Sequence, residues 1–346
     1  SQPPKTDLES FHFRNLHHKV LIGTASDRYA GWIGQIYSQD RYAGRITKRT
    51  KIVALKSFTE EVLPVDSVEE YFEHFPVLEI DFIFYRPLLD QNGQPNQNYQ
   101  VLKTYARHLK KGDRIILKVP QMIMAQKIRK GDYYVANPAY LNPKMFTEQF
   151  YEPAINLLGA NLTGFIFEQE YQRKEDRLPV VKMAYGLNIF FSQVPTDSRY
   201  HLELRTDLYL RDQVFEVLAK YGVGQVLSHW TWLPPLRKQL AKADGRFFNA
   251  GNECVIRLMT PLGMRYEDAY AKAHPFDRLV EGMLQPEMVF ETVEMVKSAI
   301  EKGMMVNLII NNRAGGNAPM IAEIISEKLF PKPTPKSKGQ MSLWDS

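Results

Sequence analysis

Charged side chains lie within several short aliphatic runs of this chain, where they are costly unless they are paired or used. Glu79 and Asp81 are two residues apart, and so are Glu203 and Arg205, so each pair would share one face of a strand. Comparable runs also carry polar residues at or near their ends: Lys118, Gln169, His229 and Arg257. Carboxylates beside cations could transfer protons and stabilise developing negative charge, as phosphoester hydrolysis requires.

The catalytic candidates from this set are Glu79, Glu203, Lys118 and His229. Glu79 or Glu203 would act as the base, while Arg257 or Arg205 would stabilise charge. The alternative is an internal ion-pair network, in which Lys118, Arg205 and Arg257 neutralise the two glutamates. The sequence leaves both interpretations open.

A second candidate is the polar loop that follows the aliphatic run before residue 311 and leads into a helix. Free backbone N–H groups at a helix start, with Arg257 and Arg313 nearby, could hold a phosphate or carboxylate group. A tight turn that needs glycine is the alternative. The expected ligand contacts are Asp81, Tyr85, Gln169, Arg205, Arg257, Asn311, Asn312, Gly315 and Gly316.

The sequence identifies no cofactor. Glu79, Asp81, Glu203 and His229 could ligate a divalent ion. However, no His-x-x-x-His spacing is present, and the neighbouring cations would repel a metal, so we assign no metal site. Cys254, the only cysteine, excludes an intrachain disulfide and fits a small core residue in a reducing compartment.

Short aliphatic runs alternate with amphipathic stretches, which is typical of βαβ units. Eight strands each followed by a helix predict a closed TIM-type (β/α)8 barrel, an α/β fold, whose ligand site lies at the C-terminal strand ends. An open doubly wound sheet is less favoured, because no Gly-x-Gly-x-x-Gly follows the first strand. The expected strands are 19–24, 77–83, 114–119, 164–168, 200–205, 224–229, 253–259 and 305–310.

Helix starts are expected at Ser67, in a capping box with Glu70, and at Pro143 and Pro286. Two basic insertions, residues 38–59 and 121–142, are expected on the rim at the C-terminal strand ends. Tyrosines interleave with the basic residues of the second insertion, which suits a nucleic-acid or phosphate contact. Solvated irregular loops are the alternative.

The chain has 346 residues and a formal net charge of +5, a mild basic bias that is compatible with anionic partners. We expect an N-terminal extension at 1–18, one barrel domain at 19–330, and a Pro/Lys linker with a tail peptide at 331–346. Ser1–Ser10 lacks a signal-peptide core, and no apolar stretch is long enough to span a bilayer. We therefore expect a cytoplasmic protein with no membrane partner.

The tail alternates proline and lysine and ends in an apolar peptide, residues 340–344. Its sequence, Gln-Met-Ser-Leu-Trp, resembles the bacterial sliding-clamp-binding peptide. That resemblance implies that Gln340 would anchor by hydrogen bonds while Leu343 and Trp344 fill an apolar groove of a clamp. The alternative is a tail whose apolar side chains pack on their own barrel.

Several short motifs stand in order along the chain: Ile22-Gly23-Thr24, Gly31-Trp32, residues 79–85, Lys118, Gln169, residues 203–205, Arg257, Asn311-Asn312 and residues 316–319. Together they resemble the YecE-like barrel family, domain of unknown function 72. The resemblance covers residues 19–330 and implies an eight-stranded TIM barrel with a conserved polar cleft and no established activity. It also implies a distant similarity to xylose-isomerase and endonuclease-IV type barrels.

The chain departs from the family pattern at places that bear on chemistry. Asp81 stands where the family usually has asparagine, and Ala25-Ser26-Asp27 replaces Ser-Gly-Trp. Gln121–Gln126 lacks the family's Thr-His, Thr206 replaces a frequent histidine, and Ser228-His229 replaces an aspartate-containing strand end. These changes remove acid–base candidates that the resemblance would otherwise imply.

We therefore expect a barrel that binds an anionic, phosphate-bearing ligand, either as a phosphoester hydrolase linked to DNA metabolism or as a non-enzymatic adaptor on a sliding clamp or nucleic acid. A sugar-type isomerase or lyase is a third reading, by barrel analogy alone.

Overall fold

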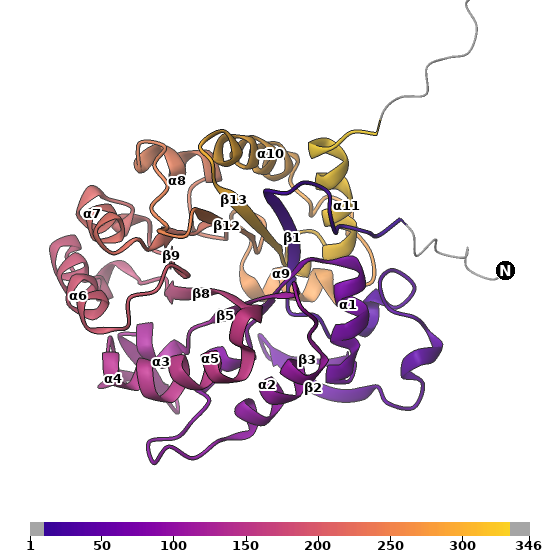
Figure 1. Cartoon of the computed structure of the whole chain (residues 1–346), viewed down its shortest axis with the longest axis horizontal. Helices are drawn as coiled ribbons and strands as arrows, with labels where there is room; N and C mark the ends of the chain where they lie inside the picture. Colours follow the sequence, from indigo (N-terminus) through magenta and orange to yellow (C-terminus); the bar gives the residue numbers. More distant parts are fainter. Residues whose placement is uncertain (1–9, 333–346) are drawn as a thin grey trace, which may run out of the picture.

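A computed structural model describes residues 10–332 and forms a parallel barrel with helices around it (Figure 1). The order of hydrogen-bonded strands is β10-β9-β8-β5-β4-β1-β13-β12-β11. The barrel strands are β1 (Val20–Ala25), β4 (Val77–Ile80), β5 (Arg114–Lys118), β8 (Leu162–Gln169), β9 (Tyr200–Leu204), β10 (Gly224–Gln225), β11 (Leu227–His229), β12 (Glu253–Leu258) and β13 (Met305–Ile310).

Closure of the barrel depends on the sixth strand position, where the expected strand 224–229 is in two pieces. β10 pairs with β9, and β11 pairs with β12 on the other side. Only Val226 separates the two pieces, and its N–H still donates to Leu202 O of β9. The two pieces therefore join the ends of the sheet, and the predicted (β/α)8 barrel is confirmed.

The predicted strand at 77–83 ends three residues early. Asp81 adopts a right-handed helical backbone conformation, and Phe82–Tyr85 form a 3₁₀ turn. Since the chain turns at Asp81, the expectation that Glu79 and Asp81 share one strand face is wrong.

The helices are α1 (Val68–His74), α2 (Gln97–His108), α3 (Gln121–Met124), α4 (Pro143–Phe146), α5 (Glu152–Leu158), α6 (Val180–Gln193), α7 (Asp212–Tyr221), α8 (Leu236–Lys242), α9 (Tyr266–Ala273), α10 (Pro286–Glu301) and α11 (Ala318–Leu329). The starts at Pro143 and Pro286 are confirmed, and a π-helical turn joins α4 to α5. The capping box is wrong: Ser67 makes no side-chain cap, and Glu70 instead accepts hydrogen bonds from Ser38 and Tyr42.

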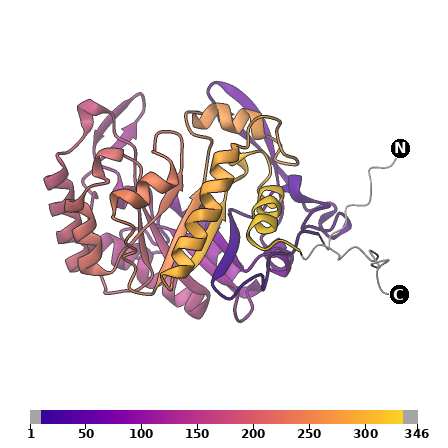
Figure 2. The same ribbon diagram turned by 90° about the horizontal axis from the view of Figure 1, so that it is seen from above.

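Both basic insertions contain antiparallel hairpins, so the irregular-loop alternative is wrong. The first holds β2 (Thr47–Val53) and β3 (Lys56–Val62), and the second holds β6 (Lys127–Lys130) and β7 (Tyr133–Ala136). They follow the C-terminal ends of β1 and β5, as expected for rim insertions, and stand at one end of the barrel with α9 (Figure 2). Val53 packs in one cluster with Tyr270 and Phe276, so the first hairpin is anchored to α9 and the loop after it.

The barrel interior is apolar in the middle and charged at its C-terminal end. Val77, Ile116, Ile166, Val255 and Ile309 form one buried cluster. Residues two positions further along β4, β5, β8 and β12 are charged and buried: Glu79, Lys118, Glu168 and Arg257.

No helix within residues 10–332 is long and apolar enough to cross a membrane. The proposed clamp contacts Gln340, Leu343 and Trp344 lie outside the described residues, as does the tail beyond residue 332.

Candidate functional site

Arg257 lies at the centre of the polar end of the barrel. Its Nε and Nη2 donate to the two carboxylate oxygens of Glu79 at 2.9 and 2.6 Å, and its Nη1 donates to Glu203 Oε2 at 2.7 Å. All three side chains are at most 1% exposed. Burial alone would lower the pKa of Arg257, but Glu203 and Glu79 raise it well above its ordinary value.

The network continues towards the barrel mouth through Arg205. Arg205 Nε donates to Glu203, its Nη1 lies 2.6 Å from Glu168 Oε1, and Glu168 Oε2 accepts from Lys118. Burial would raise the pKa values of Glu203 and Glu168, but the neighbouring cations hold both below the ordinary range. Glu168 was missed by the sequence analysis, although it ends an expected strand.

Three carboxylates and three cations thus alternate in one charge ladder: Glu79, Arg257, Glu203, Arg205, Glu168 and Lys118. The formal charges of these six side chains cancel. Because each cation is bound to a carboxylate, the geometry favours the ion-pair network that the sequence left open as an alternative. Glu79 and Glu203, both 0% exposed, are poorly placed to act as bases on a ligand at the mouth.

The loop from Asn311 to Gly316 is a buried, internally capped turn. Asn311 Oδ1 accepts from Arg313 N, and Asn312 Oδ1 accepts from both Ala318 N and Trp32 Nε1. The N–H groups of Gly315 and Gly316 donate to Asn312 O. These donors are therefore used within the fold, and the turn joins the Trp32 segment to the start of α11.

Three other predicted site residues have structural partners. The Nδ1–H of His229 donates to Thr260 O at 2.8 Å, and burial lowers the pKa of this histidine to about 4. Gln169 links β8 to the end of β9, since its Oε1 accepts from Thr206 N. Asp81 accepts from Ser26 Oγ at 2.6 Å and lies away from the ladder.

Aromatic side chains surround the mouth of the barrel at the outer end of the ladder. Arg205 lies over the ring of Trp230 at 4.9 Å, and Lys118 lies over Phe84 at 3.9 Å. Tyr171 contacts the rings of both Trp230 and Trp232. The predicted contact Tyr85 is 81% exposed and stands free for a ligand.

Glu170, one residue beyond β8, is a half-buried carboxyl group at this mouth. Burial raises its pKa, partly offset by a hydrogen bond from Gln121 Nε2. Its raised pKa contrasts with those of Glu168 and Glu203, which the neighbouring cations lower. The sequence analysis did not single it out.

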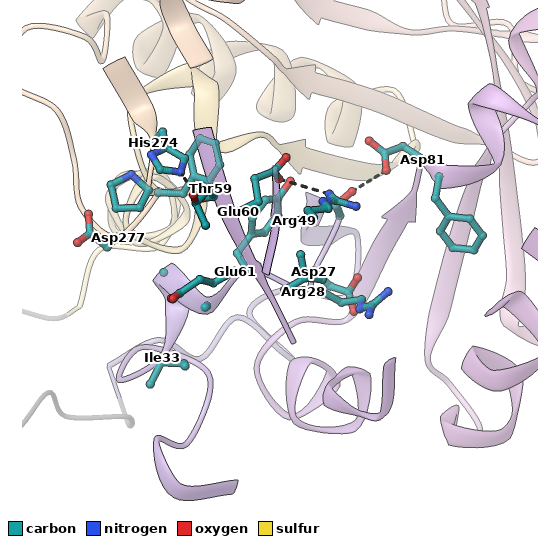
Figure 3. A pocket seen from close by; sticks show the side chains of 18 of the residues that line it. Asp27, Arg28, Ile33, Arg49, Thr59, Glu60, Glu61, Asp81, His274 and Asp277 are labelled. Atoms are coloured by element: carbon teal, nitrogen blue, oxygen red, sulfur yellow. Dashed lines mark hydrogen bonds and ion pairs between the residues drawn. The ribbon is translucent and has the colours of Figure 1, made fainter. Parts of the chain in front are cut away.

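A separate cavity of about 560 Å³, the side pocket, lies beside the barrel mouth (Figure 3). Its walls come from the segment after β1, the first hairpin, the end of β4, α2 and the loop after α9. Asp27 is 2% exposed, and its Oδ1 accepts from Tyr105 at 2.7 Å. Burial raises the pKa of Asp27 to about 6. In the sequence, the departure of Ser26-Asp27 from the family pattern pointed to this site.

Within residues 10–332, no group of three or more His, Cys, Asp or Glu side chains is arranged to hold a metal ion. The four candidate ligands from the sequence are separated: Glu79 and Glu203 bind Arg257, Asp81 binds Ser26, and His229 binds Thr260.

The fold is similar to solved structures of one family. A DUF72 family protein from Enterococcus faecalis V583 has a TM-score of 0.55 at 15% identity, with 91% of this chain and 97% of that chain covered. One from Thermotoga maritima MSB8 has a TM-score of 0.53 at 14% identity, with 91% and 100% covered. A search of curated proteins gave no match.

A family model described as "Protein of unknown function DUF72" matches residues 21–341, nearly the whole barrel and the start of the tail peptide. This match agrees with the resemblance found in the motifs, since the YecE-like barrels are the same family. The chain belongs to the DUF72 family.

Proposed function

We propose that the C-terminal face of the barrel binds single-stranded nucleic acid across its aromatic mouth. One observation carries the proposal. Seven aromatic residues are exposed in the described part of the chain, and five of them follow the C-terminal ends of barrel strands: Tyr85, Tyr133, Tyr134, Tyr171 and Trp232. The other two, Tyr185 and Phe290, lie on the outer helices α6 and α10.

Exposed aromatic rings are platforms for unpaired bases, because every base has a stacking face. Tyr171 and Trp232 lie 6.2 Å apart between centroids and are 41% and 46% exposed, so both rings are available to a ligand. Stacking on such a ring contributes about 1–3 kcal/mol per base.

Basic residues border the aromatic rings. Arg177 lies over the ring of Tyr171 at 5.9 Å, and the second hairpin carries Arg129 and Lys130, which are exposed. Such cations would contact backbone phosphates without reading sequence. The cations of the barrel interior are already paired with carboxylates. We therefore propose that an anionic ligand contacts the rim and not the interior.

Binding of fluorescein-labelled oligothymidylate to the full chain, followed by anisotropy, tests the proposal. We expect affinity that falls steeply with salt, because bound counterions are released. Trp232→Ala and Tyr171→Ala should each weaken binding by about tenfold. Tyr185→Ala, a ring on α6 that is 67% exposed, is the control. No binding at low salt, or equal losses in all three variants, would overturn the proposal.

A second candidate, phosphoester hydrolysis, is favoured by Glu170. A carboxyl group with a raised pKa at the mouth could donate a proton to a leaving oxygen. The wild type should then cleave a single-stranded oligonucleotide, with Glu170→Gln slowed by about a hundredfold or more. Glu175→Gln, in the same loop and exposed, should retain full activity. Binding without turnover in the wild type would instead favour the non-enzymatic adaptor.

The adaptor reading has a separate basis in the tail peptide, residues 340–344. We propose that Gln340, Leu343 and Trp344 bind a sliding clamp, with the two apolar side chains as anchors. A peptide of the last ten residues should bind a bacterial clamp in roughly the micromolar range. Leu343→Ala with Trp344→Ala should abolish binding while barrel stability is unchanged. A barrel destabilised by this double variant would identify the tail as a packing element.

A further inference from the structure

We propose that the side pocket binds a small organic cation, an ammonium or guanidinium group carried on an apolar body. This site is distinct from the aromatic mouth and takes a ligand of opposite charge. Its volume of about 560 Å³ is within the ordinary range for small-molecule sites.

The charged end of the pocket is formed by Asp27 and Asp81. Asp27 Oδ1 accepts from Tyr105, while its Oδ2 is buried and has no hydrogen-bond partner among residues 10–332. Asp81 accepts from Ser26 Oγ, and both Ser26 and Asp81 line the pocket. A buried carboxylate oxygen without a donor is rare in folded proteins, and a ligand N–H group would satisfy it.

The pocket's own cations offset the charge of this end only in part, through the interaction of Arg28 with Asp27. Five acids line the pocket, namely Asp27, Glu60, Glu61, Asp81 and Asp277, against Arg28 and Arg49. Arg28 Nε donates to Leu63 O at 2.6 Å, and Arg49 pairs with Glu60 on the hairpin wall (Figure 3). The remaining negative charge at Asp27 and Asp81 selects a cation rather than an anion.

The remaining walls of the side pocket are aromatic and would contact the apolar part of the ligand. Tyr29 packs against Phe276 at 5.5 Å between ring centroids, and Phe82 packs against Tyr105 at 6.0 Å. All four residues line the pocket. Aromatic faces attract ammonium and guanidinium groups as well as alkyl chains.

A pH dependence follows from the surroundings of Asp27. It faces Tyr105 of α2, Tyr37, Arg28 and Asp81, and burial is the largest cause of its raised pKa of about 6. An amine stays protonated between pH 5 and 7.5, but Asp27 becomes neutral below pH 6. Amine affinity should therefore fall by about tenfold from pH 7.5 to pH 5.

The test uses calorimetric titration of the full chain with benzylamine and pentylamine, each compared with its alcohol, at constant ionic strength. We expect each amine to bind at least about tenfold more tightly than its alcohol. Asp27→Asn and Asp81→Asn should each remove most of this preference, and Asp27→Asn should also remove the pH dependence. Glu294→Gln, an exposed acid on α10, is the control.

No binding of either amine, or equal binding of amine and alcohol, would overturn the proposal. Unchanged amine affinity in Asp81→Asn would do the same. If Asp27→Asn fails to fold, the pH dependence of the wild type and the Asp81→Asn result still decide the question. Oligothymidylate binding is measured in parallel, so failure at the side pocket is separated from failure at the aromatic mouth.

Discussion

Asp27 is a carboxyl group that the fold buries with a tyrosine partner and no direct ion pair among the described residues. Its pKa is raised from 3.8 to about 6, so its charged form is less stable in the folded chain than in the unfolded chain. Because the folded chain binds this proton more tightly than the unfolded chain, the free energy of unfolding falls as pH rises from about 4 to 6. Above pH 6 the loss of stability is complete and stays constant.

We therefore predict that Asp27→Asn stabilises the barrel at pH 7.5, by up to about 3 kcal/mol, which is the free-energy equivalent of the pKa change. At pH 4, where the native carboxyl group is already neutral, the variant and wild type should be nearly equal. Urea unfolding at both pH values measures this. A variant that is less stable at both values would show that the carboxyl group has a structural role that asparagine cannot fill.

Glu79 gives the opposite prediction, because it is the bidentate partner of Arg257. Glu79→Ala would leave a buried guanidinium with only Glu203 and should cost about 3–5 kcal/mol of stability. Glu61→Ala, which removes an exposed partner of Lys48, is the control and should change stability by less than about 1 kcal/mol. A near-zero effect for Glu79→Ala would mean that water reaches the ladder.

The sequence identified most members of the ladder, because charges two residues apart in aliphatic runs are visible as a pattern. It did not distinguish a paired network from a reactive one, since pairing depends on which strands become neighbours. Glu168 and Glu203 are directly opposite each other in the β8–β9 register, 35 positions apart in the chain. Asp27 was noted only as a departure, because its contacts are with Tyr37, ten residues later, and Tyr105 of α2, which the sequence does not place beside it.

At the scale of elements, the two rim hairpins differ from the barrel strands in burial. β2 has six residues that are exposed or half-buried and only Val53 buried, whereas β13 is buried from Val306 to Ile310. Local opening of an element needs less free energy when it buries few apolar contacts.

We predict that amides of β2, β3, β6 and β7 exchange with solvent orders of magnitude faster than those of β12 and β13. Amide hydrogen exchange followed by mass spectrometry measures the difference. A saturating amine should slow exchange in β3 if the side pocket is a site, because Glu60 and Glu61 line it. If the amides of all four hairpin strands exchanged as slowly as those of β12 and β13, the prediction would be contradicted.

Element boundaries were predicted well where proline marks them, as at Pro143 of α4 and Pro286 of α10. Boundaries were predicted poorly where tertiary contacts determine the residue at which an element ends. The strand at Val77 stops at Ile80, although Phe82 and Ile83 are apolar, because these side chains turn to pack against the barrel's outer layer. Glu70 does not form the expected cap, because its carboxylate accepts hydrogen bonds from Ser38 and Tyr42 instead.

At the scale of the whole molecule, several buried groups make stability depend on pH. Burial lowers the pKa values of His201 and His229 to about 4, so both are neutral in the folded barrel. The stability that folding gains from keeping these histidines neutral is fully present above pH 6.5 and is lost as pH falls towards 4. Glu168 and Glu203 have depressed pKa values, so their contribution is lost only as pH falls below about 4.5.

We predict that barrel stability falls in two stages on acidification, the first between pH 6.5 and 4 and the second below pH 4.5. Denaturant unfolding at intervals of half a pH unit resolves them. His201→Gln should flatten the first stage and leave the second unchanged. Asp27 titrates with the opposite sign in this range, so the decisive measurement uses Asp27→Asn: constant stability of that variant from pH 7 to 5 would contradict the burial of both histidines as neutral rings.

The divided sixth strand has a consequence for how the barrel could fail. A cylinder of strands has no free edge, but here the last gap is bridged by a two-residue and a three-residue piece. If both pieces detached from the sheet, β9 and β12 would each present an unpaired edge to another chain. Self-association by edge-to-edge strand pairing would then begin at this flank of the barrel.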